Sequence, residues 1–75
     1  MFVCQMAAVS TGQNFTFDGK TYVRLPEMNL QVGRHGFVVN CARVIDSGDD
    51  YTPATKVMEY ICDRTIVRAL ETIIR

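Results

Sequence analysis

The segment NFTFDGKTYVRL, residues 14–25, constrains the fold more than any other part of the sequence. Its central Asp18-Gly19 pair lies between runs of aromatic and β-branched residues. An Asp-Gly pair tolerates the positive φ angles of a type I′ turn, so this arrangement is typical of a β-hairpin. We therefore predict a two-residue turn here and a fold that contains an antiparallel sheet.

The predicted hairpin has two faces, because side chains alternate along a strand. A two-residue turn pairs Phe15 with Tyr22 and Phe17 with Lys20. These four residues share a face with Arg24. Aromatic rings that stack on bases, mixed with cations, are typical of single-stranded nucleic-acid binding. The alternative, which we favour because aromatic residues are few, is that the rings pack in the core while the basic side chains reach its rim.

Three further segments are predicted to be extended. Residues Phe2–Val9 favour a first strand, with a short helix as the alternative, and Leu30–Val32 favour a short strand. Pro26 is predicted to end the hairpin strand, since proline cannot donate to a ladder. The longest β-like run, Phe37–Ile45, is apolar on both faces, which indicates a central strand or one at an interface.

The C-terminal part is predicted to be one long helix. Thr52 followed by Pro53 is typical of an N-cap and a first helical residue, and no glycine or proline interrupts the chain from Ala54 to Arg75. At 100° per residue, one apolar stripe gathers Met58, Ile61, Cys62, Thr65, Ile66, Ala69 and Ile73. A second strip lies opposite and consists of Tyr60, Val67 and Ile74. So small a sheet cannot cover both, so we predict that the second strip contacts a partner.

These elements define an α+β fold. We predict one domain over residues 1–75, with residues 1–45 mainly in about four antiparallel strands and residues 53–75 in a helix that covers them. A chain of 75 residues buries too little surface to be more than marginally stable alone. We therefore expect a homodimer or higher oligomer, held by the helix or by the Phe37–Ile45 strand.

Charge argues against a duplex-DNA binder. Eight basic and eight acidic residues give a net charge of zero, whereas dedicated DNA-binding domains are visibly basic. Four basic residues against two acidic ones up to Ile45 allow only a weak basic face.

The three cysteines, Cys4, Cys41 and Cys62, are widely spaced and match neither a disulfide framework nor a zinc motif. They are typical of a reduced protein, and the N-terminal residues lack the charge pattern of a signal peptide. No apolar run approaches 18 residues. We expect a cytoplasmic protein.

The sequence GRHG, residues 33–36, allows two interpretations. Flanking glycines could let backbone N–H groups approach an anion, but the pattern matches neither G-x-G-x-x-G nor the P-loop, and a predicted strand follows it. We favour a hairpin turn that carries Arg34 and His35 at its tip, where both are candidate partner contacts. His35 is the only histidine, and no local pattern pairs it with a nucleophile, so no catalytic residue is predicted.

Asp46, Asp49 and Asp50 crowd one loop. Their oxygens could hold a hard cation, but the spacing is not that of a calcium loop, and turn formation together with the predicted helix start accounts for all three. No metal or cofactor is predicted.

The hairpin also carries a resemblance. "GQNFTFDGKTYVRL" followed by "NCARVIDSGDDYTPATKV" resembles small bacteriophage and prophage accessory proteins with an F-x-F-x-G-K-x-Y-V hairpin and a later N-A-x-x-L-x-D-G segment. Here Cys41 interrupts the Asn-Ala pair. The resemblance implies a phage-encoded protein that acts in the host cytoplasm by binding a host factor, and it implies no catalytic residue.

The sequence therefore favours a non-enzymatic protein-binding module that self-associates and binds or inhibits a host protein. The first alternative is a single-stranded nucleic-acid binder that uses the hairpin face. The second is a nucleotide-sequestering protein or a small hydrolase that uses Arg34, His35 and the aspartates.

Overall fold

Six strands account for most of the chain in the computed structural model, which describes residues 2–46, 48–52 and 55–70. The elements are β1 (Phe2–Gln5), the 3₁₀ turn η1 (Met6–Ala8), β2 (Asn14–Phe17), β3 (Lys20–Val32), β4 (His35–Asp46), β5 (Thr55–Glu59) and β6 (Ile66–Ala69). All neighbouring strands are antiparallel.

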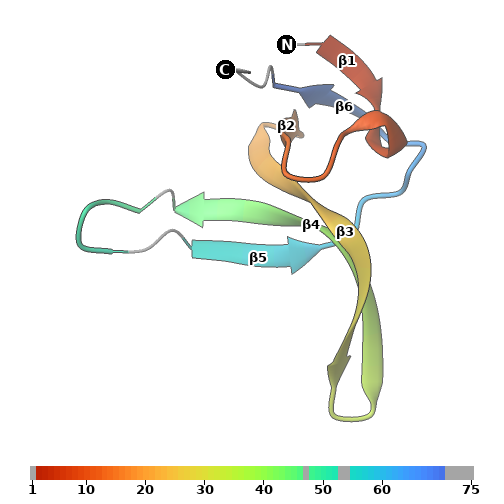
Figure 1. Ribbon diagram of the computed structural model, residues 1–75, viewed down its shortest axis with the longest axis vertical. Helices are drawn as coiled ribbons and strands as arrows, with labels where there is room; N and C mark the ends of the chain where they lie inside the picture. Colours follow the sequence, from red (N-terminus) through yellow and green to blue (C-terminus); the bar gives the residue numbers. More distant parts are fainter. Residues whose placement is uncertain (1, 47, 53–54, 71–75) are drawn as a thin grey trace.

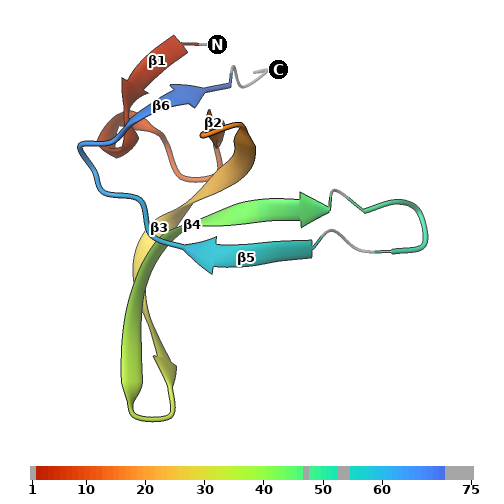
Figure 2. The same cartoon turned by 180° about the vertical axis from the view of Figure 1, so that it is seen from behind.

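The strands form one sheet in the order β1-β6-β2-β3-β4-β5. Strands β2 to β5 follow one another as a meander, and β6 then returns to lie between β1 and β2. Figures 1 and 2 show the result: β1, β6 and β2 cluster at one end, while the β3–β4 and β4–β5 hairpins project from them in two directions.

The prediction of an α+β fold with a helix over residues 53–75 is wrong. Residues 55–70 hold β5, a connection and β6, and no α-helix occurs among the described residues; residues 53–54 and 71–75 lie outside them. Burial in β6 alternates along the chain, with Val67 and Ala69 buried and their neighbours exposed. Ile66 and Ala69 fit a helical stripe, but the alternating burial and the β-branched residues Ile66 and Val67 favour a strand. Pairing with β1 and β2 decides the outcome.

The predicted hairpin at Asp18-Gly19 is confirmed. Phe15 lies opposite Tyr22 and Phe17 opposite Lys20. Asp18 has φ 53° and Gly19 has φ 73°, the two positive values that a type I′ turn requires. Local turn chemistry was therefore sufficient to give both the hairpin and its register.

The predicted bend at residues 33–36 is also confirmed, as the turn of the long β3–β4 hairpin, with Val32 opposite His35. Gly33 has φ 61°, which suits the first central position of a type II′ turn. Pro26 does not end β3 as predicted. The β3–β4 register shifts between Arg24 and Met28, and Pro26 is exposed within that irregularity, where proline is tolerated.

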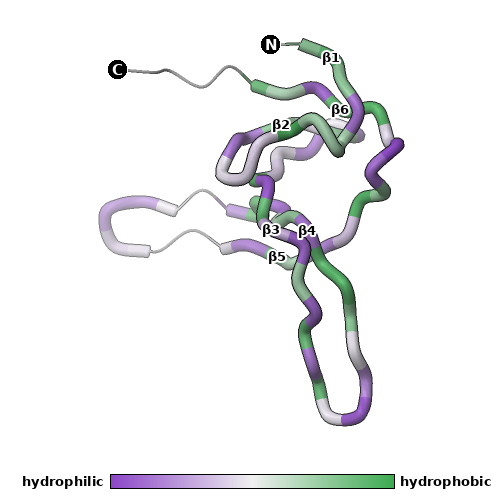
Figure 3. The backbone as a smooth tube through the Cα atoms, turned by 45° about the vertical axis from the view of Figure 1, so that its right-hand side comes forward, coloured by the Kyte–Doolittle hydropathy of each residue, from purple (hydrophilic) through white to green (hydrophobic). Residues whose placement is uncertain are grey.

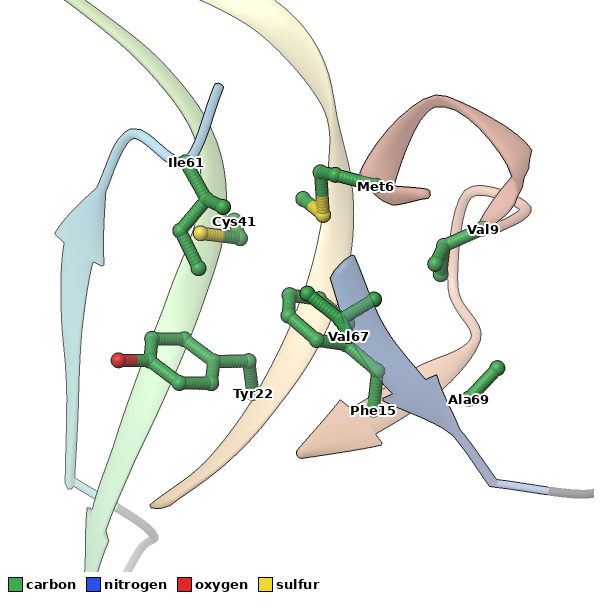
Figure 4. Close-up of a cluster of buried hydrophobic side chains, with 8 residues drawn as sticks. All are labelled: Met6, Val9, Phe15, Tyr22, Cys41, Ile61, Val67 and Ala69. Atoms are coloured by element: carbon green, nitrogen blue, oxygen red, sulfur yellow. The ribbon is translucent and has the colours of Figure 1, made fainter. Parts of the chain in front are cut away.

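The core lies at the β1–β6–β2 end of the sheet. It consists of Met6, Val9, Phe15, Tyr22, Cys41, Ile61, Val67 and Ala69 (Figure 4). The rings of Phe15 and Tyr22 stack with centroids 5.2 Å apart, so the central pair of the predicted hairpin face is a core contact. The first strand is shorter than the predicted Phe2–Val9, because the chain turns at Met6–Ala8 and inserts Met6 and Val9 into this cluster.

Asn40 fixes the connection between β5 and β6 over the core. This buried side chain donates from Nδ2 to the Ile61 carbonyl (2.8 Å) and accepts at Oδ1 from the Ile61 N–H (3.0 Å). The amide thus satisfies both backbone groups of Ile61 as a neighbouring strand would. Ile61 is thereby held with its side chain in the core.

The molecule is more extended than its length predicts. Its radius of gyration is 13.2 Å, against about 11 Å for a compact domain of this size. Its accessible surface is 5589 Å², against roughly 4,700 Å² for a folded chain of this mass. The projecting hairpins leave surface open that a compact fold would cover.

Candidate partner-binding surface

The outer part of the β3–β4 hairpin, Met28–Val32 with His35–Val39, forms what we call the hairpin arm. No third strand of the described chain pairs with it: β2 reaches β3 only up to Val23, and β5 reaches β4 only from Cys41 onward. Two-stranded ribbons of this kind are marginally stable in water without further cover.

One face of the hairpin arm is apolar. Because cross-strand partners share a face, it gathers Met28, Leu30, Val32, Phe37 and Val39, with His35 beside Val32 at the tip. Exposure rises from base to tip: Val39 is 5% exposed, Phe37 53% and Val32 64%. Val39 points to the same side of β4 as the core residue Cys41, so the arm continues the core face beyond the residues that cover it. In Figure 3, green apolar segments extend along both strands.

The opposite face of the arm is mostly polar. Asn29 and Gln31 lie on it with Gly36 and Val38. A Cβ at Gly36 would approach the Gln31 side-chain oxygen to 3.1 Å, so the glycine leaves room for the glutamine to lie across the ribbon. The arm is therefore amphipathic, with a solvent face and a bare apolar face.

A second exposed apolar group lies on the β4–β5 hairpin. Ile45, Val57, Met58 and Tyr60 are each 42% to 52% exposed. Ile45 is displaced from the ladder by a register shift between Val44 and Asp46. We call these four residues the β4–β5 cluster. They lie on both faces of the other projecting hairpin (Figure 1), because Val57 pairs with Arg43 and the next residue, Met58, pairs with Ala42.

The strip predicted from Tyr60, Val67 and Ile74 does not exist as a helix face. Tyr60 is exposed after β5, Val67 is buried in the core at 2% exposure, and Ile74 lies outside the described residues. Arg34 and His35 are both exposed at the tip of the hairpin arm, as predicted from the turn, and adjoin its apolar face at Val32. The partner surface suggested by the structure therefore lies on the hairpin arm and on the β4–β5 hairpin.

The candidate nucleic-acid face is mostly inside the protein. Phe15 and Tyr22 are 0% and 4% exposed, and Phe17 is half-buried against the core. Lys20 is exposed, whereas Nη1 of Arg24 is buried with no hydrogen-bond partner in the described part of the chain. Rings held in a core cannot stack on bases, so this face lacks the platform that single-strand binding requires.

Cys41 is a poor candidate nucleophile. Burial, with Glu59 nearby, raises the pKa of its thiol to about 11, and a protonated thiol reacts slowly. His35 lies six residues along β4, about 20 Å away at ~3.3 Å per residue, so the imidazole cannot activate it.

The aspartates stabilise turns. Asp46 accepts from the Gly48 N–H (2.9 Å), and Asp49 accepts from the N–H groups of Tyr51 (2.8 Å) and Thr52 (2.7 Å). These bonds to backbone N–H groups lower the pKa of Asp49. Within residues 2–46, 48–52 and 55–70, no three potential ligands gather to hold a metal.

An open hollow of about 550 Å³ lies between the Asp18-Gly19 turn and β6, at the opposite end of the sheet from the two projecting hairpins. Val3 and Ile66 supply apolar contact, and Thr16 and Arg68 supply polar groups. Arg68 is the one basic residue that lines this open hollow, and the lining does not indicate a particular ligand or reaction.

Comparisons with protein-family models, with curated proteins and with solved structures find no match to this chain. The resemblance to phage accessory proteins therefore stays a prediction. No helix in the part of the chain that the structure describes is long and apolar enough to span a bilayer.

Sequence reasoning missed Val32, Phe37 and Val38 as surface residues, and with them most of the β4–β5 cluster. The one useful signal was the run Phe37–Ile45, which is apolar on both faces and indicated a central or interface strand. The first description is confirmed for part of the strand, because β4 lies between β3 and β5 from Cys41 onward; an interface at β4 stays a prediction.

Proposed function

We propose that the protein is a non-enzymatic protein-binding module whose projecting hairpins contact protein partners. The observation that carries the proposal is the apolar surface on those hairpins: the hairpin arm with Val32 and Phe37, and the β4–β5 cluster. Exposed apolar side chains on projecting hairpins are typical of protein–protein contacts.

Charge favours a protein over a nucleic acid as the partner. Between Pro26 and Val39 the only formal charges are Glu27 and Arg34, so the hairpin arm has no cationic track for a phosphate backbone. An apolar face without a cationic track is better matched to a protein surface.

The resemblance of the hairpin sequence to phage accessory proteins supports a more specific form of the proposal. In this form the protein is phage-encoded, acts in the host cytoplasm, and binds or inhibits a host protein. The β4–β5 cluster is then the surface that contacts the host protein.

Affinity capture from a bacterial lysate tests the proposal, with Val57→Asp and Met58→Asp as variants and Lys20→Asp as a control. Lys20 is exposed at the other end of the sheet, so its substitution leaves both projecting hairpins intact. We expect the wild type and Lys20→Asp to retain a protein that the two cluster variants lose. Steeply salt-dependent binding of single-stranded oligonucleotides, with no protein contact of any kind, would contradict the proposal.

A further inference from the structure

The hairpin arm has a bare backbone edge on β4. Val32 and His35 pair across the two-residue turn, so they exchange hydrogen bonds, and every second residue of β4 beyond His35 also bonds to β3. The residues in between, Gly36 and Val38, therefore direct their N–H and C=O groups to the other edge. β5 pairs with that edge only from Cys41 onward, so the described part of the chain leaves it open along the arm (Figures 1 and 2).

The two edges of the arm differ in how they are protected. The β3 edge contains Pro26, Glu27 and a register shift, all of which hinder the addition of a strand. The β4 edge from Gly36 to Cys41 contains neither a formal charge nor a proline, and Phe37 and Val38 on it are 53% and 44% exposed. An unprotected edge of this kind is a template for another strand.

We propose that the same β4 edge of a second copy of this chain pairs with it, antiparallel about a two-fold axis at Phe37. This inference rests on the proposed function and deepens it, because it names one protein that the projecting hairpins bind. It also gives the Phe37–Ile45 segment the interface role that its two apolar faces predict.

The two-fold arrangement satisfies the open backbone groups. Gly36 then lies opposite the partner's Val38 and exchanges two hydrogen bonds with it, and the symmetric contact supplies two more. Phe37 lies opposite the partner's Phe37 in a non-hydrogen-bonded pair, where cross-strand side chains approach most closely. A two-stranded ribbon is marginally stable alone, whereas the resulting sheet of four strands with one apolar face has the size that independent stability requires.

Closure of the assembly favours a second copy as the occupant. An isologous contact uses the same patch twice, so the dimer covers both bare β4 edges at once. Only the β3 edges of the arms then remain outside, and these contain Pro26 and Glu27. A strand of an unrelated protein would leave the β4 edge open whenever that protein is absent.

Charge favours the antiparallel arrangement. Arg34 is the only formally charged residue within 28–42, and it is exposed at the tip of the arm. Parallel pairing in register would place it beside the partner's Arg34. About the two-fold axis at Phe37, it instead reaches the level of the partner's Asn40, at the base of the other arm.

The surroundings of Asn40 carry negative charge that suits the arriving Arg34. Asn40 holds the backbone of Ile61 where the chain leaves β5, and exposed Asp63 follows two residues later. Desolvation, and next the charge of Asp63, raise the pKa of Tyr60 in this connection, while Arg24 has a smaller opposing effect. The basic tip of each arm is therefore complementary to the exit of β5 in the other copy.

Light scattering during size exclusion tests the edge, with Val38→Pro as the variant and Val38→Thr as its matched control. The Val38 N–H points away from β3, so proline removes it without breaking the β3–β4 ladder, and proline is tolerated at such an edge position. Two of the four hydrogen bonds between the copies are lost, whereas threonine keeps all four. We expect a dimer for the wild type and Val38→Thr, and at least a tenfold weaker association for Val38→Pro. Circular dichroism verifies that each variant is folded.

Disulfide cross-linking with oxidised glutathione tests the register, in a chain whose Cys4 and Cys62 are replaced by alanine; Cys41 is buried. Phe37→Cys places two thiols at the two-fold axis with Cα atoms about 4.5 Å apart, a distance that a disulfide can bridge. Val38→Cys is the control, because its two thiols lie on a diagonal with Cα atoms about 7–8 Å apart, which is too far. We expect the covalent dimer to form at least tenfold faster in Phe37→Cys than in Val38→Cys.

Three results would overturn the inference. They are a wild-type monomer at high micromolar concentration, a Val38→Pro variant that associates as strongly as Val38→Thr, and equal cross-linking rates for Phe37→Cys and Val38→Cys. A monomer whose protein partner is lost in Val38→Pro would assign the edge to a strand of another protein instead of a second copy. A monomer that still captures a protein through the β4–β5 cluster would leave the proposed function standing. If Val38→Pro fails to fold, cross-linking still decides, because both cysteine variants keep every backbone N–H.

Discussion

The two halves of the β3–β4 hairpin contain similar residues and have opposite environments. At the base, Tyr22 and Cys41 are 4% and 0% exposed; at the outer half, Val32 and Phe37 are 64% and 53% exposed. All four residues are apolar or aromatic, and all lie in the same pair of strands. The difference is due to β6 and the Ile61 connection, which cover the base and end before the arm begins. Burial along this hairpin depends on which other segments pack over it, and only weakly on the residue types of its two strands.

We expect the largest effect from a substitution in the core beside the base of the β3–β4 hairpin. Phe15→Ala removes a ring that is stacked on Tyr22 and fully buried, and we expect it to lower the free energy of unfolding by about 3–5 kcal/mol. A 75-residue chain has little more stability than that, so the variant should be largely unfolded by circular dichroism.

Phe37→Ala on the arm is the matched comparison. We expect a smaller loss, under about 1 kcal/mol, because this ring is 53% exposed. Equal, concentration-independent losses for the two variants would show that both halves of the hairpin are core.

Asn40→Ala should lower stability by about 2–4 kcal/mol in urea unfolding. The substitution leaves the N–H and the carbonyl of Ile61 without partners in a buried site, and each unsatisfied group costs about 1–3 kcal/mol. The control is Asn29→Ala, an exposed position on the arm, which should change little. A neutral result at Asn40 would mean that the connection does not depend on this amide.

Alkaline pH should destabilise the base of the hairpin. Burial raises the pKa of the Cys41 thiol from 9.0 to about 11, so the folded state favours the protonated thiol. Its contribution is fully present below about pH 9 and is lost as pH rises to about 11, by about 2–3 kcal/mol in total. Urea unfolding of the wild type and Cys41→Ala at pH 7, 9 and 10.5 measures the difference.

Tyr22 acts in the same direction, because burial also raises its pKa. Burial of Tyr22, the largest cause of its raised pKa, is kept in Cys41→Ala, so the difference between the two proteins is mainly due to the thiol. If both proteins show the same pH profile, the stability lost at alkaline pH comes from Tyr22 or from the hairpin arm and not from Cys41.

We expect the smallest effects from substitutions in the two hairpin turns, Asp18-Gly19 and Gly33-Arg34. Asp18→Val should cost about 1–2 kcal/mol, because Asp18 has φ 53°, a conformation that β-branched residues disfavour. Arg34→Val should cost under about 0.5 kcal/mol in the protomer, since Gly33, and not Arg34, has the positive φ in that turn. Thermal unfolding at low protein concentration distinguishes these values.

The sequence was sufficient to predict local features of the fold. The Asp18-Gly19 turn, the Phe15–Tyr22 register and the bend at residues 33–36 follow from residues that are close in the chain. The run Phe37–Ile45, apolar on both faces, likewise indicated a central strand or one at an interface from its own residues alone.

The sequence was insufficient where pairing is distant. β6 is a strand because it lies between β1 and β2, more than 45 residues away in the chain, whereas Ile66 and Ala69 also fit a helical stripe. Asn40 gave no signal of its role, since its partner is the backbone of Ile61. The candidate surface was misplaced for the same reason: Val67 was assigned to a helix face that non-local pairing replaced.

The insertion of β6 between β1 and β2 has a consequence for how the protein forms. During synthesis the β2–β5 meander can assemble as its hairpins emerge, since each joins neighbouring segments, whereas β1 must wait for a strand made some 60 residues later. Until β6 arrives, the aromatic pair lacks the cover of Val67 and Ala69. We therefore expect nascent chains that end before Ile66 to remain open and sensitive to protease, and completion of this one strand to be the committing step of folding.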